Sequence, residues 1–430
     1  MSGVNRRIFL AGAGAGVASM ALGRGARAAG ANDRIRVAVV GVRGRGRSHI
    51  AAFTRNQNTV VAALCDVDAR QFAEPARQVE EKSGKAPTLV GDLRRLMDDK
   101  SIDVVSIATP DHWHALAAVW ACQAGKDVYV EKPVSHNLRE GRKIVEAARK
   151  YDRVVQTGTQ NRSSEGVTEA MEHLHSGALG KVFLARGLCY KPRESIGRKA
   201  DAPVPEGVDY DLWLGPAPER PFNPNRFHYE WHWFWDYGTA DSGNQGVHQM
   251  DVARWGLGKD HLPKHIQSSG GRFGYEDDGQ TPNTQVTTYR YDDCQLEFEV
   301  RGLPTNAERG IKVGNLFYGP KGYMVVDGNS WATYLGPKEE PGPKGGGKGD
   351  EQAHFDNFVG AVLDRKPASL HAEVLEGHLS SALCHLGNVS YRVGRALDFD
   401  PQSETCRSDR EADALLGREY RSPFTMPDAV

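Results

Sequence analysis

The sequence predicts an α/β protein that begins with a doubly wound parallel sheet and continues into an α+β domain with a large, mostly antiparallel open sheet. Three observations predict this fold class. From residue 35 to about residue 157, short apolar strands alternate with helical stretches, as in consecutive βαβ units. The first strand ends at a glycine-rich turn. After about residue 180, segments of alternating polarity are separated by turn residues, which is typical of antiparallel sheets.

The parallel sheet is predicted from short, β-branched apolar runs, and the helices between them from longer periodic stretches. After the first strand, we predict strands at 60–65, 104–108, 127–130 and 154–157, and helices at 113–124 and 138–150. We place this domain at residues 33–158. An acidic residue, Asp66, closes the second strand.

The second domain is predicted at residues 159–398. Its strands are expected at 181–190, 285–291, 295–301, 311–318 and 322–326. Residues 337–350 contain three consecutive glycines and are predicted to form a flexible surface loop. Helices are expected at 352–363 and 372–393. These C-terminal helices are expected to pack back on the first domain. The polar segment 399–430 is predicted to be a surface tail.

The first strand runs into a turn that suits a dinucleotide. Its apolar residues stop at Gly41, and Gly44 and Gly46 follow. A turn of this kind lets a pyrophosphate approach bare backbone at a helix N-terminus. The spacing departs from G-x-G-x-x-G, because Arg43 occupies the position of the middle glycine. The turn alone is therefore equally compatible with an ordinary strand-to-helix connection. The candidate cofactor-binding residues here are Gly41, Arg43, Gly44, Arg45 and Gly46.

Asp66 follows the glycine turn by about 25 residues. A carboxylate at this place accepts hydrogen bonds from the adenosine ribose and repels a 2′-phosphate, which favours NAD over NADP. An ordinary loop aspartate is the alternative interpretation. Arg43, Arg45 and Arg47 keep NADP open as a cofactor.

A second group of candidate residues follows the strand at 127–130, which continues as Glu131-Lys132-Pro133. The carboxyl end of a parallel strand faces the ligand crevice, and the proline predicts a fixed peptide bond that aims the lysine. The alternative is a solvated charge at a strand end. Further on, Asn244, His248, Asp251 and Trp255 are three or four residues apart. They share one polar face if the segment is helical.

These motifs, taken in order, resemble the glucose–fructose oxidoreductase and inositol 2-dehydrogenase family (Gfo/Idh/MocA). The resemblance rests on the glycine turn, the segment Ala-Thr-Pro-Asp-His-Trp-His at 108–114, Glu131-Lys132-Pro133, the segment around His248 and the helix from His378. It covers essentially the whole chain after the leader, and Glu131-Lys132-Pro133 is its most specific element.

The resemblance implies catalytic roles for three residues. Lys132 would hydrogen-bond the reacting hydroxyl and relay its proton, and His248 would act as general base or acid. Family members usually carry Asp four residues before this histidine, where this chain has Asn244. An amide orients a hydroxyl but does not titrate, so this departure puts the simple proton relay in question. The resemblance adds Thr109, Pro110, His114, Glu131 and Lys132 to the cofactor-binding residues.

An aromatic-rich segment at 227–237 carries Trp231, Trp233 and Trp235. One interpretation is that these rings bind a sugar, because flat apolar rings match the C–H faces of pyranoses. An equal alternative is a strand in the core or at a subunit interface, in which the three tryptophans lie on the same face. We expect no metal site, because the histidines of this region lack a metal-ligand spacing. The candidate substrate residues are Asp111, which replaces the Asn of many relatives, and Tyr190, His232, Trp235 and Asp251.

The N-terminus predicts export. Arg6-Arg7 precede an uncharged, glycine-rich run, and Ala26-Arg27-Ala28 forms a small-x-small cleavage pattern. We predict a twin-arginine signal peptide over residues 1–28 and a periplasmic or secreted protein. A membrane anchor is disfavoured, because the apolar run is short.

The net charge of −1 and the absence of a basic block exclude nucleic acid as an expected partner. Six cysteines without C-x-x-C spacing disfavour a structural zinc site.

Together these features lead to one main functional hypothesis and two alternatives. The main hypothesis is a periplasmic NAD(P)-dependent oxidoreductase that acts on a sugar or glycoside hydroxyl and retains its cofactor tightly. One alternative is an NAD-dependent glycoside hydrolase, which the resemblance includes as a branch. The other is a sugar-binding protein that has lost activity. The resemblance also implies a homodimer or homotetramer.

Overall fold

Six parallel strands form the first sheet of the computed structural model, which describes residues 34–349, 351–406 and 408–430. The predicted leader lies outside these residues. The strands are β1 (Ile35–Val40), β2 (Thr59–Cys65), β3 (Thr88–Val90), β4 (Val104–Ile107), β5 (Asp127–Val130) and β6 (Val155–Thr157). Their spatial order is β3-β2-β1-β4-β5-β6. The order reverses between β1 and β4, so the ligand crevice is expected at the carboxyl ends of these two strands.

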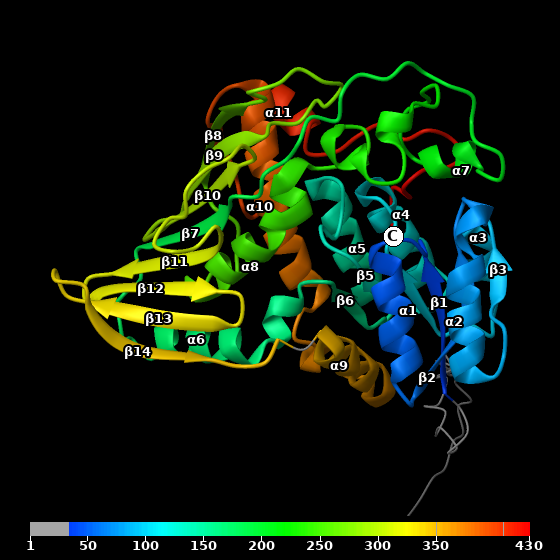
Figure 1. The fold of residues 1–430 in the computed structure, drawn as a ribbon, viewed down its shortest axis with the longest axis horizontal. Helices are drawn as coiled ribbons and strands as arrows, with labels where there is room; N and C mark the ends of the chain where they lie inside the picture. Colours follow the sequence, from blue (N-terminus) through cyan, green and yellow to red (C-terminus); the bar gives the residue numbers. More distant parts are fainter. Residues whose placement is uncertain (1–33, 350, 407) are drawn as a thin grey trace, which may run out of the picture. The chain divides into compact units, whose positions relative to one another are not determined.

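Helices cover both faces of this sheet (Figure 1), and its central strands β4 and β5 are accordingly buried throughout. On one face, α1 (Arg45–Arg55) and α9 (Glu351–Asp364) pack against Tyr129, whose ring stacks on Phe355 at a centroid distance of 4.5 Å. On the other face lie α4 (Asp111–Gln123) and α5 (Leu138–Lys150), with a core of small and branched residues.

The second sheet has nine strands in the order β14-β13-β12-β11-β7-β10-β9-β8-β15. Only β7 and β10 pair in parallel, so the predicted, mostly antiparallel sheet is confirmed. The strands are β7 (Leu184–Cys189), β8 (His265–Gly271), β9 (Thr284–Arg290), β10 (Gln295–Arg301), β11 (Val313–Gly319), β12 (Gly322–Asp327), β13 (Ser330–Leu335), β14 (Glu340–Gly346) and β15 (Leu397–Asp398).

One face of the nine-stranded sheet packs against helices. The apolar residues of β10 alternate with charged ones, and the apolar side joins a core with α8 (Val247–Gly256) and α10 (Val374–Val393). Helix α10 also packs on α5 and β6 of the first domain. The remaining helices are α2 (Ala73–Ser83), α3 (Arg94–Asp98), α6 (Glu165–His175), α7 (Tyr210–Leu214) and α11 (Arg410–Ala414).

The prediction of a flexible loop at 337–350 is wrong. Residues Glu340–Gly346 form β14, which pairs antiparallel with β13 at the edge of the sheet. An edge strand tolerates Pro341 and Pro343, because only one side of its backbone has to pair. Glycine and proline residues favour loops in isolation, but pairing with β13 determines the conformation of this segment.

The segment 399–430 differs from the predicted surface tail. Ala412, Leu416 and Phe424 in it are buried, and the ring of Phe424 lies 5.6 Å from that of Trp113 in α4. These isolated apolar residues have no helical or strand period, so the sequence pattern gave no sign of their burial.

A long connection links β7 to α8, and we call residues 191–240 the strap. It carries α7 and two short helical turns, and Figure 1 shows it in green, running from the nine-stranded sheet across to the first domain. Two backbone hydrogen bonds join it to the end of β2: Ala69 N–H donates to the Gly207 carbonyl at 2.8 Å, and Asp209 N–H donates to the Val67 carbonyl at 2.8 Å. The strap therefore bridges the two sheets.

Candidate active site

A cavity of about 670 Å³ lies at the carboxyl end of the parallel sheet and is lined by both domains and the strap. Fourteen of the predicted site residues line it: Gly41, Arg43, Gly44, Arg45, Asp66, Thr109, Pro110, Asp111, His114, Glu131, Lys132, His232, Asn244 and His248. The predicted residues Gly46, Tyr190, Trp235 and Asp251 do not line it. One continuous cavity thus joins the glycine turn to the candidate catalytic residues.

The glycine turn is shaped by close backbone approach. Gly41 has a φ of 81°, and a Cβ there would lie 2.6 Å from the Ala108 carbonyl oxygen. A Cβ on Gly46 would lie 1.7 Å from the Gly41 carbonyl oxygen. Both positions therefore require glycine. Gly46 packs against the Gly41 carbonyl and does not line the cavity, whereas the exposed Arg43 does. The bare turn ahead of α1 fits a pyrophosphate.

Asp66 lies beside this turn. Its Oδ2 accepts a hydrogen bond from Val42 N–H at 3.0 Å, and its Oδ1 accepts one from Asp68 N–H at 2.9 Å. Burial raises the pKa of Asp66 above its usual value. The carboxylate is held by backbone donors at the end of β2, the position at which a ribose hydroxyl is bound in such sheets.

Glu131 is a buried anchor at the end of β5. Its Oε1 accepts from Arg45 Nε at 2.6 Å and lies 3.1 Å from His49 Nε2. Although burial opposes ionisation, Arg45 and His49 hold the pKa of Glu131 well below its usual value. Gly158 leaves room for it, because a Cβ there would lie 2.7 Å from Glu131 Oε1. The structure therefore places Arg45 and Glu131 in one ion pair that also lines the cavity.

Lys132 extends from this anchor toward the second domain. The Lys132–Pro133 peptide bond is cis, and Lys132 Nζ donates to the backbone carbonyl of Asn244 at 2.6 Å. Burial lowers the pKa of Lys132 below its usual value. A lysine with a lowered pKa exchanges protons more readily near neutral pH, as an acid–base residue requires.

His248 and Asn244 enter the cavity from consecutive turns. A π-helical turn, Ser242–Gly246, precedes α8, which begins at Val247. Burial lowers the pKa of His248 to about 3, so its imidazole is neutral at pH 7. Its Nδ1 is buried without a hydrogen-bond partner among the described residues. π-turns of this kind are frequent at functional sites.

Asp251 lies on a different side of α8 from the predicted polar face. Both of its carboxylate oxygens accept from Arg162 Nε, at 3.0 and 2.9 Å, and Oδ1 also accepts from Ser380 Oγ at 2.7 Å. The side chain is fully buried in this network. The prediction that Asp251 shares a substrate-facing surface with His248 is therefore not supported by its placement, because the π-turn and the Arg162 pair determine the orientation of the helix.

The N-terminus of α4 brings Asp111 and His114 to the cavity. Asp111 Oδ2 accepts from Thr239 Oγ1 at 2.7 Å, and burial raises the pKa of Asp111 to about 6. His114 Nδ1 lies 2.7 Å from the Pro133 carbonyl oxygen, and Nε2 lies 2.8 Å from the Thr109 carbonyl oxygen. His114 thereby connects the ends of β4 and β5 and fixes the backbone beside Lys132.

The aromatic-rich segment is a turn of the strap and not a strand. Residues Glu230–Trp233 form a short 3₁₀ helix, in which His232 stacks on Trp231 at a centroid distance of 3.6 Å. His232 Nδ1 donates to the Tyr229 carbonyl at 2.5 Å, which leaves Nε2 as an acceptor. Burial lowers the pKa of His232 to about 3. His232, Trp231 and Tyr229 line the cavity.

Trp235 and Tyr190 lie outside the cavity. The guanidinium of Arg392 lies 5.1 Å from the Trp235 ring, near the end of α10. Tyr190 follows β7 on the sheet face away from α8, where its hydroxyl oxygen lies 2.7 Å from a Glu299 carboxylate oxygen and 2.9 Å from one of Glu308 and donates to one of them. These placements correct the predicted substrate contacts. Side chains alternate between sheet faces, so a shift of one residue moves a side chain to the other face.

Several lining residues carried no signal in the sequence. Asp68 and Gln160 lie in no motif, whereas His228 and Tyr229 belong to the aromatic-rich segment but carried no separate signal, and the arrangement of all four depends on contacts between distant segments. His228 Nε2 of the strap lies 3.0 Å from Asp68 Oδ2, two residues beyond Asp66. This contact adds a side-chain link to the backbone bonds between the strap and β2.

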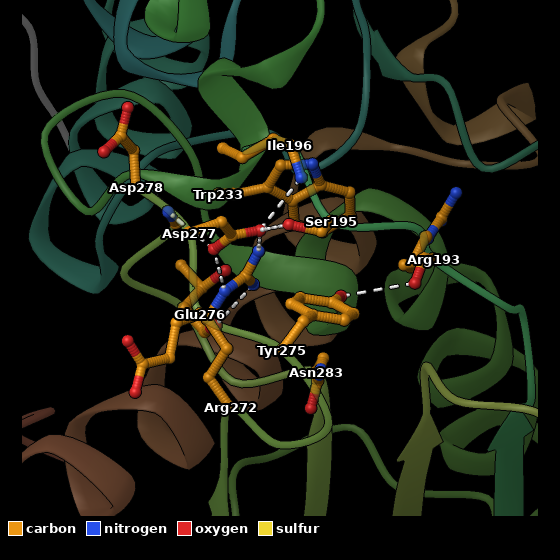
Figure 2. Close-up of polar contacts among 12 residues, drawn as sticks. Arg193, Ser195, Ile196, Trp233, Arg272, Tyr275, Glu276, Asp277, Asp278 and Asn283 are labelled. Atoms are coloured by element: carbon orange, nitrogen blue, oxygen red, sulfur yellow. Dashed lines mark hydrogen bonds and ion pairs between the residues drawn. The ribbon is translucent and has the colours of Figure 1, made fainter. Parts of the chain in front are cut away.

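The other end of the strap is held by the long loop between β8 and β9. Figure 2 shows Asp277 of this loop between the Arg272 guanidinium and the start of the strap. Arg272 Nε donates to Asp277 at 2.6 Å, Ile196 N–H donates to it at 2.9 Å, and the Tyr275 hydroxyl donates to the Arg193 carbonyl at 3.2 Å. The strap is thus fixed to both domains.

Neither a metal-binding cluster nor a membrane-spanning helix occurs in the part of the chain that the structure describes. There, no three His, Cys, Asp or Glu side chains gather as they would around a metal ion. Over the same residues, every helix is too short or too polar to cross a membrane.

The fold and the cavity define a two-domain protein with a dinucleotide-binding Rossmann domain. Residues 35–159 match the model of the NAD-binding Rossmann fold of the Gfo/Idh/MocA oxidoreductases, and residues 196–426 match the model of a C-terminal α/β domain of the same family. The chain belongs to the Gfo/Idh/MocA oxidoreductase family, and its first domain is an NAD-binding domain. The predicted family and fold class are confirmed.

Similarity to individual proteins is local in sequence and extensive in fold. The chain is 34% identical over 96 residues to levoglucosan dehydrogenase of Pseudarthrobacter phenanthrenivorans, covering 22% of this chain and 25% of that protein. It is 32% identical over 143 residues to inositol 2-dehydrogenase of Salmonella typhimurium, covering 32% of this chain and 41% of that protein. These matches span less than half the length of either relative.

A solved structure extends the comparison of the fold. The WlbA dehydrogenase of Bordetella pertussis, in complex with NADH and UDP-GlcNAcA, has a TM-score of 0.62 at 16% identity. The match covers 85% of this chain and 99% of that one. At this identity the likeness shows the fold alone.

Proposed function

We propose that this chain is an exported, NAD-dependent oxidoreductase that acts on a hydroxyl of a sugar or glycoside and retains its cofactor tightly. One observation carries the proposal: a single cavity joins the glycine turn and Asp66 to Lys132 and His248. A nucleotide-binding end and a proton-exchanging end in one cavity are what hydride transfer from an alcohol requires.

The binding part of the site fits a dinucleotide. The bare glycine turn and the N-terminus of α1 would hold the pyrophosphate, and Asp66 would accept hydrogen bonds from a ribose. The paired carboxylates of Asp66 and Asp68 disfavour a 2′-phosphate, which supports NAD over NADP. Bound NAD supplies the acceptor for the hydride that leaves the substrate carbon.

The chain's own residues handle the proton. The substrate hydroxyl loses its O–H proton as its carbon loses hydride, so a base must lie at the hydroxyl oxygen. Lys132 Nζ and the neutral imidazole of His248 are the groups in place for this task. Asn244 holds Lys132 through its backbone carbonyl, so an amide side chain at this position leaves the lysine positioned.

Tight retention is supported by the strap. Backbone bonds to Val67 and Ala69 and the His228–Asp68 contact close the strap over the β2 side of the cavity. A cofactor between the glycine turn and the strap would leave only after these contacts opened. Retention also suits the predicted export, because a folded protein that leaves the cytosol must carry its cofactor with it.

A carbohydrate substrate is supported by the names of the relatives and by the composition of the cavity wall. The wall combines the rings of Trp213, Tyr229 and Trp231 with polar groups of Lys132 and His232. Aromatic faces pack on sugar C–H groups while polar side chains bind hydroxyls. A homodimer or homotetramer remains part of the proposal and is measured by light scattering of the purified protein.

A glycoside hydrolase that oxidises its sugar transiently is the second candidate, and His232 favours it. Such a reaction needs one base for the hydroxyl and a further base for a carbon-bound proton, whereas a dehydrogenase needs one. The site holds two neutral histidines, His232 and His248, on different elements.

The experiment is to purify the full chain, extract it with acid and identify released nicotinamide. The purified protein is then incubated with free sugars and with aryl glycosides, without added cofactor. Conversion of one sugar to its oxidised product with reduction of another supports the oxidoreductase. Release of the aryl group without net change at 340 nm supports the hydrolase. A protein that neither retains nor binds nicotinamide would refute both.

A further inference from the structure

Five carboxyl groups line the cavity, and only one is placed to exchange a proton near Lys132. Asp66, Asp68 and Asp92 follow β2 and β3, on the side of the glycine turn. Glu131 is held in its charged form by Arg45 and His49. Because Asn244 does not titrate, Asp111 is the remaining carboxyl at the end of the cavity that holds Lys132.

Asp111 has a well-defined environment. It is the first residue of α4, its side chain is 3% exposed, and Thr239 of the strap donates to its Oδ2 at 2.7 Å. The charged or titratable groups that act on it are His114 on its own helix, Glu131 and Lys132 just after β5, and Cys384 of α10. Burial raises the pKa of Asp111 to about 6, so the carboxyl exchanges its proton in the working range of most proteins.

We propose that Asp111 is a positioning residue that sets the charge of Lys132 Nζ and stores the proton that Lys132 takes from the substrate hydroxyl. The proposal rests on the proposed function. The hydroxyl O–H bond breaks and an N–H bond forms at neutral Lys132. The ammonium then gives a proton to the Asp111 carboxylate, and bound NAD would accept the hydride that leaves the substrate carbon. Asp111 afterwards releases the proton to water.

The direction of the coupling follows from the charges. The Asp111 carboxylate favours the ammonium form of Lys132 and so raises the pKa of Lys132. Asp111→Asn removes this charge, and the pKa of Lys132 should fall. Thr239→Val removes a hydrogen bond that favours the carboxylate, so the pKa of Asp111 should rise. At pH 6 to 7 only, Thr239→Val should therefore leave Asp111 largely uncharged and affect Lys132 as Asp111→Asn does.

The test measures Lys132 directly. The purified protein is labelled with trace acetic anhydride from pH 5 to 10, and modification of Lys132 is quantified by mass spectrometry. We expect Asp111→Asn to label about tenfold faster at a fixed pH that lies above 6, where the wild-type carboxylate is charged, and below the midpoint of the Lys132 labelling curve, since one nearby charge shifts a pKa by roughly one unit. Thr239→Val should show a smaller increase that disappears above pH 8. Asp98→Asn, an exposed carboxyl on α3, is the control.

Each outcome bears on one proposal. Wild-type labelling rates for Lys132 in folded Asp111→Asn and Thr239→Val would overturn the coupling, whatever the activity. Circular dichroism verifies folding, and Thr239→Val keeps the test valid if Asp111→Asn does not fold. A labelling shift in a protein that oxidises no sugar supports the coupling and overturns the proposed function instead.

Discussion

Lys132 combines a half-buried side chain, a lowered pKa and a hydrogen bond to a backbone carbonyl. Its neighbour Glu131 is held by Arg45 and His49, so the strand end below the lysine is fixed. The lysine is thus presented by a rigid element, and its amine is available for proton exchange.

Lys132→Ala should lower sugar oxidation by about 10²- to 10⁴-fold, the usual contribution of a general acid–base group. Cofactor content, measured by acid extraction and absorbance, should stay near that of the wild type. Lys150→Ala, on the exposed end of α5, is the matched control. Loss of the cofactor from Lys132→Ala would instead show that this residue binds it.

Buried neutral histidines predict acid sensitivity. Burial lowers the pKa of His112, His248 and His385 to about 3, from an unfolded value near 6.5. Below that value the unfolded chain binds protons that the folded chain does not, so stability is lost as the pH falls. Each such group contributes about 1.4 kcal/mol per pH unit. The Tm measured at pH 5 should lie below that at pH 7.5; an equal or higher Tm would contradict this prediction.

At the scale of elements, the strap decides what the cavity encloses. It is fixed to the second domain by the Asp277 network, which Figure 2 shows, and to the first domain by backbone bonds at Val67 and Ala69. Between these points it presents His232 and Tyr229 to the cavity. The same element therefore closes the nucleotide end and forms a wall of the substrate end.

Weakening the strap should loosen the cofactor. In His228→Ala the contact with Asp68 is lost, so bound nicotinamide should dissociate several-fold faster during gel filtration. Lys132 is untouched, and a single turnover begun with full cofactor should keep its rate. Arg198→Ala, whose partner Glu276 is exposed, is the control on the same strap. Equal retention in both variants would show that the His228 contact does not limit release.

At the scale of the molecule, α10 joins the domains. It packs on α5 and β6 of the first domain and on α8 and β8 of the second. Close approach to β6 depends on Gly377, because a Cβ there would lie 1.9 Å from Thr157 Oγ1. The relative position of the two ends of the cavity therefore depends on packing around one helix.

Gly377→Ala should destabilise the protein by about 1–3 kcal/mol through overpacking, and sugar oxidation should fall with it. Gly360→Ala in α9 is a matched control, since a Cβ there meets no atom within 4 Å. That substitution should be neutral or stabilising by up to about 1 kcal/mol. Thermal unfolding of both variants gives the comparison, and an unchanged Tm in Gly377→Ala would contradict the packing argument.

The sequence by itself determined the local structure and the motifs. The strand at Asp127–Val130, the helix at Leu138–Lys150 and the glycine turn at Gly41 follow from short-range patterns. Lys132 was predicted because it follows a strand whose carboxyl end faces the crevice of a parallel sheet, and His248 because its segment resembles the corresponding segment of the family. Such features depend on neighbouring residues and on a regular architecture.

Only the tertiary structure decided which other side chains complete the cavity. Asp68 and His228 are 160 positions apart, and Asp111 and Thr239 are 128 apart, so no periodic pattern connects them. Tyr190 lies outside the cavity because side chains alternate between the two faces of a sheet, and Tyr190 is on the face away from α8. Contacts between distant segments arise from packing of the whole chain, and for this reason the position of the strap over the cavity and the partners of its residues could not be found from local sequence patterns.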